Sequence, residues 1–266
     1  PDTPVNWCED LGTVLANDEL KYGFSERGGY PVIKRKMKQW ALRITAYSNR
    51  LLEDLNKIDW PSSIKEIQKN WIGKSTGASI FFKIDKKENA SIEVYTTRPD
   101  TIFGVTFLVL SPEHQIIKEF IQSKHVSAYV KECKQKTEIE RKKTKSINGV
   151  FSGMYALHPI TNKKIPIWIS DYVLIDYGTG AIMAVPCGDQ RDWSFANKFD
   201  LEIRNIFKGV DISKSAHEEK EIILKDSDFV NGLSSIEASH MIVSFLESKK
   251  LGFSKTNFKQ RDAIFS

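Results

Sequence analysis

Apolar residues recur at two different spacings along the chain, and the change of spacing separates predicted helices from predicted strands. Between about residues 34 and 55 they return every three or four positions with charged residues between them, which is typical of an amphipathic helix. A shorter helix is predicted over 64–71 and a longer one over 234–250. In the longer helix Ser235 is the expected N-cap, although Ala238 stands where a capping box has Glu or Gln.

In the middle of the chain the apolar residues form short runs rich in Ile, Val, Phe and Tyr, which predict β-strands. The predicted strands cover 79–84, 90–96, 105–110, 165–170, 172–175, 181–185 and 203–207. Helical patterns at 112–143 and 192–199 interrupt them, and 208–228 is predicted to be a charged loop. Because strands and helices do not alternate regularly, the pattern favours a mixed α/β fold with a β-barrel-like core at about 72–230 over a doubly wound sheet.

The composition allows a nucleic-acid partner without requiring one. Lys and Arg total 39 against 34 acidic residues, and many enzymes share such a formal charge of +5. The widely spaced Cys8, Cys133 and Cys187 argue against a disulfide framework and for a reducing, cytoplasmic environment. The histidines show no paired ligand spacing, which argues against a His-based metal site. No apolar run approaches the roughly 18 residues that would span a membrane.

The first group of candidate site residues is the sequence Thr-Thr-Arg-Pro-Asp-Thr at 96–101, directly after a predicted strand. Its hydroxyl groups can bind a ribose or an ester, and Arg98 can pair with a phosphate or with Asp100. A turn whose threonines only satisfy backbone groups has the same residues, so the pattern by itself leaves both interpretations open.

A second group lies in 177–192, where Gly178 and Gly180 allow a close approach of the backbone before an apolar strand. Asp189 and Asp192 then stand three positions apart, which puts both carboxylates on one face of a helical turn. A carboxylate here can bind an ammonium group, and a simple helix cap is the alternative. The segment lacks the third glycine and the following helix of a dinucleotide-binding fingerprint.

Together these two groups resemble the editing signatures of leucyl-tRNA synthetases. The first continues through 102–114 in a form similar to the threonine-rich signature of that family, and the second extends to 195–196. The segments 5–17, 38–45 and 70–75 are similar to the stretches that precede the editing domain in bacterial members. The resemblance therefore covers essentially the whole chain.

The resemblance implies a role for each matching residue. Asp192 is expected to hold the α-ammonium group of a misattached amino acid, and Thr96 and Thr97 are expected to line the site around the terminal adenosine and the ester. These three are the predicted catalytic residues, and Thr101 is expected to exclude a leucine side chain by its bulk. The other expected substrate-binding residues are Arg98, Tyr177, Met183, Val185 and Asp189.

The same resemblance implies a β-barrel editing domain at 72–230, inserted in a Rossmann catalytic body and flanked by 1–71 and a helical return segment at 231–266. The expected activity is hydrolysis of misacylated leucine tRNA, for example norvalyl- or isoleucyl-tRNA. Such editing is needed because an apolar pocket discriminates by only about 1–3 kcal/mol per methylene. The expected partners are the acceptor end of leucine tRNA and the noncognate ester, bound by a monomer. ATP and Mg are expected only in the parent synthetase, and no cofactor or metal in the editing site.

Departures from the family pattern concern a histidine and a zinc site. Many members have His directly before the first acid of the second signature, where this chain has Gly188 after Cys187. Bacterial members often bind zinc through two cysteine pairs, but here Leu11 stands three positions after Cys8, so we predict no zinc. The chain also starts at Pro1 without Met and lacks the adenylate-forming signatures, so we expect a part of a larger synthetase that does not itself activate leucine.

Two other functions are open. A catalytically silent module would bind tRNA through the basic stretch at 131–145, with salt-dependent affinity and no ester hydrolysis. Cys187 would be a nucleophile only with a base beside it, and no histidine neighbours it in the sequence.

Overall fold

The computed structural model describes residues 2–21, 23–87, 90–120, 123–135, 141, 147–175 and 178–264. The chain divides into two compact units, one formed by Ser75–Thr256 and the other by Pro1–Lys74 with Asn257–Ser266. The helix expected near the C-terminus lies inside the larger unit, and the predicted domain bounds of 72–230 stay a prediction. Within the described ranges, none of the helices combines the length and the apolar character needed to cross a bilayer.

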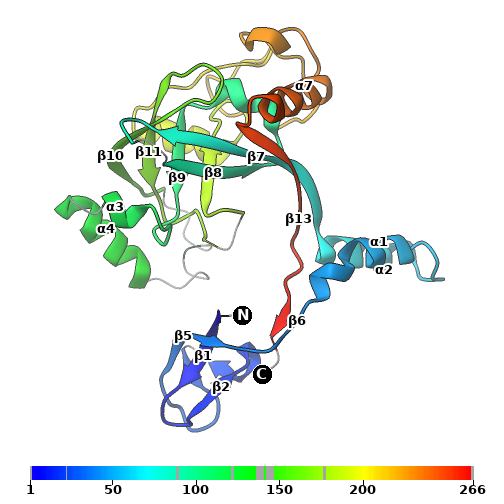
Figure 1. The fold of residues 1–266 in the computed structure, drawn as a ribbon, viewed down its shortest axis with the longest axis vertical. Coiled ribbons are helices and arrows are strands. Elements are labelled where there is room, and N and C mark those ends of the chain that lie inside the picture. Colours follow the sequence, from blue (N-terminus) through cyan, green and yellow to red (C-terminus); the bar gives the residue numbers. More distant parts are fainter. Residues whose placement is uncertain are drawn as a thin grey trace. The chain divides into compact units, whose positions relative to one another are not determined.

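The larger unit is built on a seven-stranded sheet with the order β12-β9-β11-β10-β7-β13, in which β8 also pairs with β7. Its strands are β7 (Lys74–Ile84), β8 (Ser91–Thr96), β9 (Phe107–Leu110), β10 (Val150–Leu157), β11 (Lys164–Ile169), β12 (Ala181–Ala184) and β13 (Gly252–Phe258). β9 and β11 run parallel, whereas β9 with β12, β10 with β11 and β7 with β8 are antiparallel. Figure 1 shows the long strand β7 beside β13 at one edge of the sheet.

The predicted mixed α/β class is confirmed, and the barrel stays a prediction. β8 and β12 lie next to each other, but no hydrogen-bonded ladder joins them among the described residues. The sheet therefore curves toward closure without completing it, and an unpaired seam is left between these two strands.

The central strand β9 explains why the sheet is covered on both sides. All four of its residues are buried, and their side chains alternate between the two faces. Leu108 and Leu110 belong to the large core cluster, and Phe107 and Val109 belong to a smaller cluster on the other face. In that smaller cluster the Phe107 ring stacks on Phe195 at 5.3 Å between centroids, which holds the helix that carries Phe195 against the sheet.

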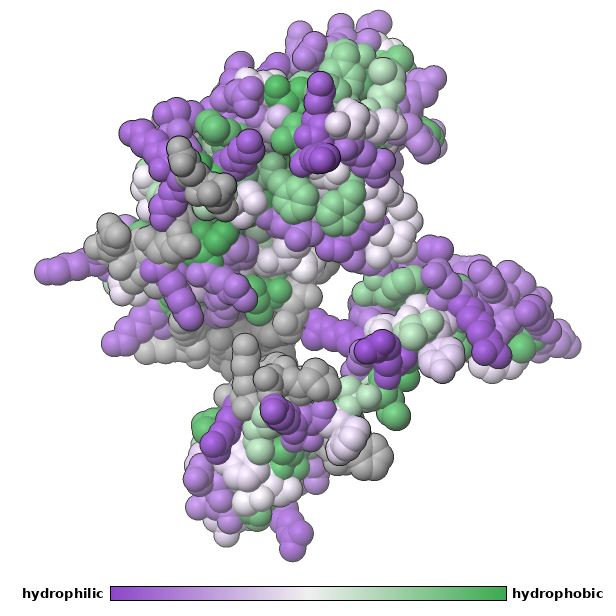
Figure 2. All heavy atoms as spheres, in the orientation of Figure 1, coloured by the Kyte–Doolittle hydropathy of each residue, from purple (hydrophilic) through white to green (hydrophobic). Residues whose placement is uncertain are grey.

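The helices of the larger unit are α3 (Ile117–Phe120), α4 (Lys124–Gln135), α6 (Gln190–Lys198) and α7 (Ser235–Ser248), with 3-10 turns η3 (Pro99–Gly104) and η4 (Asp228–Val230). α7 was predicted, but the expected cap was wrong by one residue. Ser234 is the N-cap, and it forms a complete capping box with Glu237. Figure 2 shows a largely hydrophilic face, with apolar side chains gathered over α7.

The smaller unit corrects the helix predicted over 34–55. Residues Val32–Lys38 form the strand β5, which pairs with β1 (Asp2–Cys8), and β1 also pairs with β2 (Thr13–Leu15). Two-residue strands complete the unit: β3 (Leu20–Lys21) with β4 (Phe24–Ser25), and β6 (Ala41–Leu42) with β14 (Ala263–Ile264). Its 3-10 turns are η1 (Asn17–Glu19) and η2 (Ile44–Tyr47). Helix forms in α1 (Ser48–Asp54), and the predicted α2 (Ser62–Ile72) ends at Gly73 with a left-handed φ of 59°.

Some other local predictions were wrong. Residues 172–175 form a turn, and 203–207 contributes only an isolated bridge between Phe207 and Leu224. The helix predicted over 112–143 is divided into α3 and α4 within the described residues. The strands β1, β10 and β13 were not predicted. Pairing with a distant strand decides such segments, and their own residues express it weakly.

Candidate functional site

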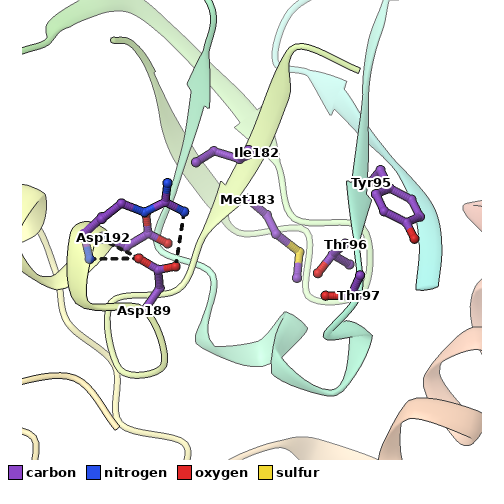
Figure 3. Close-up of a pocket in the computed structure, with 8 residues that line it drawn as sticks. Tyr95, Thr96, Thr97, Ile182, Met183, Asp189 and Asp192 are labelled. Atoms are coloured by element: carbon purple, nitrogen blue, oxygen red, sulfur yellow. Dashed lines mark hydrogen bonds and ion pairs between the residues drawn. The ribbon is translucent and has the colours of Figure 1, made fainter. Parts of the chain in front are cut away.

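A cavity of about 130 Å³ lies between the end of β8, the strand β12 and the start of α6 (Figure 3). Its lining residues are Tyr95, Thr96, Thr97, Ile182, Met183, Asp189, Arg191 and Asp192. The threonine group and the acidic group, far apart in the sequence, therefore share one cavity. It occupies the seam between β8 and β12, where the missing ladder leaves room for a ligand.

Asp192 is the buried acid of this cavity, with 4% of its surface exposed. Its carboxylate accepts a hydrogen bond of 2.8 Å from the Val185 N–H and a longer one of 3.4 Å from the Tyr172 hydroxyl. Asp189 is the N-cap of α6, and its side chain accepts from the N–H groups of Arg191 and Asp192. Asp189 is therefore the cap, so Asp192 is not needed for that role, and its binding of an ammonium group stays a prediction.

Burial raises the pKa of the Asp192 carboxyl to about 7, and the negative charge of Asp189 acts in the same direction. The Val185 N–H, the Arg191 guanidinium and the Tyr172 hydroxyl act in the opposite direction. An opposite charge beside a buried carboxylate favours its charged form. The cavity is therefore suited to a ligand with an ammonium group.

The threonines form the opposite wall. Figure 3 shows the Met183 side chain reaching from β12 toward Thr96 and Thr97, so an apolar group separates the hydroxyls from the carboxylates. The Thr96 hydroxyl accepts a hydrogen bond of 3.0 Å from the Arg98 N–H. Thr97 is exposed, and its hydroxyl is available to a polar group of a ligand.

Gly77 of β7 allows the threonine turn to lie where it does. A Cβ atom at this buried glycine would be 2.0 Å from the Thr96 carbonyl oxygen and 2.9 Å from the Thr97 Cα. Both neighbours are backbone atoms, which cannot rotate away as the end of a side chain can. The position of the threonine wall therefore depends on the absence of a side chain at Gly77.

Arg98, Asp100 and Thr101 stabilise the turn that carries Thr96 and Thr97, but they do not line the cavity. Arg98 forms a two-pronged ion pair with Asp100, at 2.8 Å for the shortest contact, and Asp100 is 1% exposed. The Thr101 hydroxyl donates to the Arg98 carbonyl at 2.8 Å. Ser239 of α7 reaches Asp100 at 3.4 Å, so α7 helps to hold this turn.

The structure brings together five of the predicted site residues: Thr96, Thr97, Met183, Asp189 and Asp192.

Val185, Arg98 and Thr101 lie outside the lining, and Tyr177 lies outside the described residues. Val185 contributes its N–H group to Asp192 instead of its side chain. The prediction did not include Tyr95, Ile182 or Arg191, which also line the cavity. Arg191 directly precedes Asp192 and lies two positions after Asp189, and that signal could have identified it.

Neither a thiol nucleophile nor a metal site finds support. Burial raises the pKa of the Cys187 thiol to about 11, so the thiol is protonated at neutral pH. In the part of the chain that the structure describes, no group of three or more His, Cys, Asp or Glu is placed to hold a metal ion. Cys8 is buried in β1, and the absence of zinc stays a prediction.

Comparison with known proteins gives one consistent family. The family model described as "Leucyl-tRNA synthetase, editing domain" matches residues 69–247. The whole chain is similar to the leucine--tRNA ligases of Christiangramia forsetii, with 54% identity over 28% of that protein, and of Flavobacterium johnsoniae, with 53% identity over 29%. A solved LeuRS from Agrobacterium radiobacter K84, in a ternary complex with tRNA and LeuAMS, matches 98% of this chain and 30% of its own with 32% identity and a TM-score of 0.76.

The fold and the cavity, taken with these similarities, define an editing module of the aminoacyl-tRNA synthetases. More particularly, the chain belongs to the leucyl-tRNA synthetase family. It spans 28–30% of the length of the curated relatives that it matches.

Asp192→Asn should stabilise the protein in a pH-dependent way. The folded-state pKa of about 7 lies above the ordinary value of 3.8 for an aspartate, so the folded protein binds this proton more tightly than the unfolded chain. The free energy of unfolding of wild type therefore falls as the pH rises from about 4 to about 7. The neutral variant shows no such fall from this position. We expect the free energy of unfolding of the variant to exceed that of wild type by on the order of 4 kcal/mol at pH 8 and to match it near pH 4.

Denaturant unfolding across this pH range measures the difference. Glu202→Gln, which removes the same charge from an exposed position, controls for the change in net charge. A constant difference between Asp192→Asn and wild type at all pH values would contradict the assignment of the raised pKa.

Gly77→Ala should displace the threonine turn. Because the new methyl group meets backbone atoms, we expect a loss of about 1–3 kcal/mol in the free energy of unfolding, as for other overpacked sites. Thr76→Ala, at the exposed neighbouring position, should change it by no more than about 0.5 kcal/mol. Equal stability of Gly77→Ala and wild type would mean that the turn does not need this close approach.

Proposed function

We propose that the cavity hydrolyses the ester between a noncognate amino acid, such as norvaline or isoleucine, and leucine tRNA. The observation that supports this most directly is the shared cavity, which a buried acid lines on one side and two threonine hydroxyls line on the other, with Met183 between them. An aminoacyl ester has a positive ammonium group close to a polar ester and ribose. The two walls offer complementary groups for these two ends.

In this proposal Asp192 binds the α-ammonium group. The positive charge of that group stabilises the ionised form of the carboxylate, which burial destabilises. The hydroxyls of Thr96 and Thr97 bind the ester and the ribose of the terminal adenosine. A water molecule attacks the ester carbonyl carbon, and the bond between that carbon and the ribose oxygen breaks. The ribose oxygen takes one proton from the attacking water and leaves as a hydroxyl, the second proton passes to solvent, and the amino acid leaves with its carboxylate. Holding both ends of the substrate fixes the ester for this attack.

In the same proposal Thr101 prevents hydrolysis of the leucine ester, although its side chain acts indirectly. Thr101 is 4% exposed and lies outside the cavity lining, with its hydroxyl on the Arg98 carbonyl. We propose that it excludes leucine by holding the threonine turn close to β12, where Met183 narrows the cavity. The parent synthetase would charge leucine tRNA with ATP in the cytoplasm and pass misacylated ends to this site.

A non-catalytic tRNA-binding module is the second candidate. One of the basic residues of its predicted binding surface is not available to tRNA. Arg141, inside the basic stretch 131–145, is 7% exposed and pairs with Glu113 at 2.6 Å. Its charge is therefore used internally, while much of that stretch lies outside the described residues. A site for phosphate alone would also have no use for the buried acid of the cavity.

Asp192→Ala should reduce kcat/KM for deacylation of norvalyl-tRNA(Leu) by about a hundredfold, because it removes a charge-assisted hydrogen bond worth roughly 1.5–3 kcal/mol. Deacylation is measured by loss of labelled amino acid from the tRNA, with Glu202→Ala as a control that removes an exposed acid. Unchanged deacylation by Asp192→Ala refutes the proposed function. Salt-dependent tRNA binding without any deacylation by wild type would favour the non-catalytic module.

Thr101→Ala should allow leucyl-tRNA(Leu) itself to be hydrolysed, because the turn loses its bond to the Arg98 carbonyl and the cavity widens. Thr101→Ser keeps this hydroxyl and removes only the methyl group, so it separates the hydrogen bond from the bulk of the side chain. We expect Thr101→Ser to spare leucyl-tRNA(Leu) in the same deacylation assay. If Thr101→Ala also spares it, Thr101 has no part in the exclusion of leucine.

A further inference from the structure

The segment Ile212–Glu218, here named the clasp segment, is bound to the part of the chain that carries the site acid. The His217 N–H donates to the Cys187 carbonyl at 2.9 Å, and the Ala216 N–H donates to the Gln190 side-chain oxygen at 3.0 Å. In the opposite direction, the Gln190 N–H donates to the Glu218 carboxylate at 3.3 Å.

A fourth bond lies one turn further along α6. The Trp193 indole N–H donates to the Ile212 carbonyl at 3.0 Å. These four bonds join the clasp segment to residues 187–193, the stretch that contains both Asp189 and Asp192. The sequence suggested only a charged loop over 208–228, with no link to the site.

The start of α6 needs such external partners. The first N–H groups of a helix have no partners inside it. Asp189 satisfies those of Arg191 and Asp192, and Glu218 of the clasp segment satisfies that of Gln190. A helix of nine residues is also too short to be stable by itself, so its position depends on tertiary contacts.

We propose that the clasp segment positions the carboxylate that binds the substrate ammonium, with Gln190 and Trp193 as positioning residues. The inference rests on the proposed function for its substrate, which is an amino acid ester with a free α-ammonium group. None of these residues needs to touch that substrate. They act by fixing the first turn of α6, and with it the distance between Asp192 and the threonine wall.

The clasp segment also bears on water access to Asp192. The titratable and charged groups around this carboxylate are Asp189 at the N-cap of α6, Arg191 within α6, Tyr172 of the turn after β11, and Cys187 of the turn after β12. Loosening the first turn of α6 admits water to the carboxylate and also weakens the effect of Asp189, whose negative charge raises the same pKa. Hydration favours the charged form, so the pKa of Asp192 should fall when the clasp segment is released.

The test uses Gln190→Ala, which removes the acceptor for the Ala216 N–H, and Trp193→Phe, which removes only the indole donor and keeps an aromatic ring. Ser215→Ala is the matched control within the clasp segment, where the side chain is exposed. We expect both test variants to lower kcat/KM for norvalyl-tRNA(Leu) by about tenfold, since small misplacements at a reacting centre cost large factors. The acid limb of the pH–rate profile should move down by about one pH unit in both, as hydration of Asp192 requires.

A carbon-13 NMR titration of the Asp192 carboxyl in the free protein gives the second readout, which needs no substrate. A merely structural role would lower the melting temperature and leave the Asp192 pKa and kcat/KM at the wild-type values. That result in the folded Trp193→Phe variant overturns the proposal, even where Gln190→Ala fails to fold. If wild type hydrolyses no ester, the proposed function fails, and the NMR titration still decides the positioning role.

Discussion

The ionisation of one buried carboxylate is the constraint on which the site depends. Asp192 is removed from water, and its pKa of about 7 reflects the free energy needed to keep it charged there. The fold reduces this cost by directing the Val185 N–H, after the last residue of β12, at the carboxylate. A ligand cation would supply the remaining compensation, so the same burial that weakens the fold would favour a cationic ligand in the cavity.

The architecture around Asp192 follows from that requirement. Aromatic packing of Phe195 on Phe107 holds α6 against β9, and β9 in turn pairs with β12. Opposite this rigid wall, the turn after β8 is held by the pair of Arg98 and Asp100. Because no ladder joins the strands of the two walls within the described part of the chain, backbone hydrogen bonds do not fill the space between them.

Prediction from the sequence succeeded where local pattern and tertiary packing agree. The strands β7, β8, β9, β11 and β12 and the helix α7 carry apolar residues at the period that their burial requires. It failed for β5, whose residues also fit a helical spacing, because pairing with β1 decided its conformation. The cap of α7 was misplaced by one residue, since Ser234 and Ser235 are adjacent and only the reciprocal bond with Glu237 distinguishes them.

The sequence by itself determined the family and the two groups of candidate site residues. It also determined the functional groups that they carry, because a carboxylate at 192 and hydroxyls at 96 and 97 are properties of the side chains. Only the tertiary structure decided that these groups share one cavity. It also decided that Thr101 and Arg98 lie outside the lining of this cavity and that the clasp segment is hydrogen-bonded to α6. The reason is physical. Side-chain chemistry is local, whereas burial, pKa and the meeting of distant strand ends arise from contacts between residues that the sequence keeps far apart.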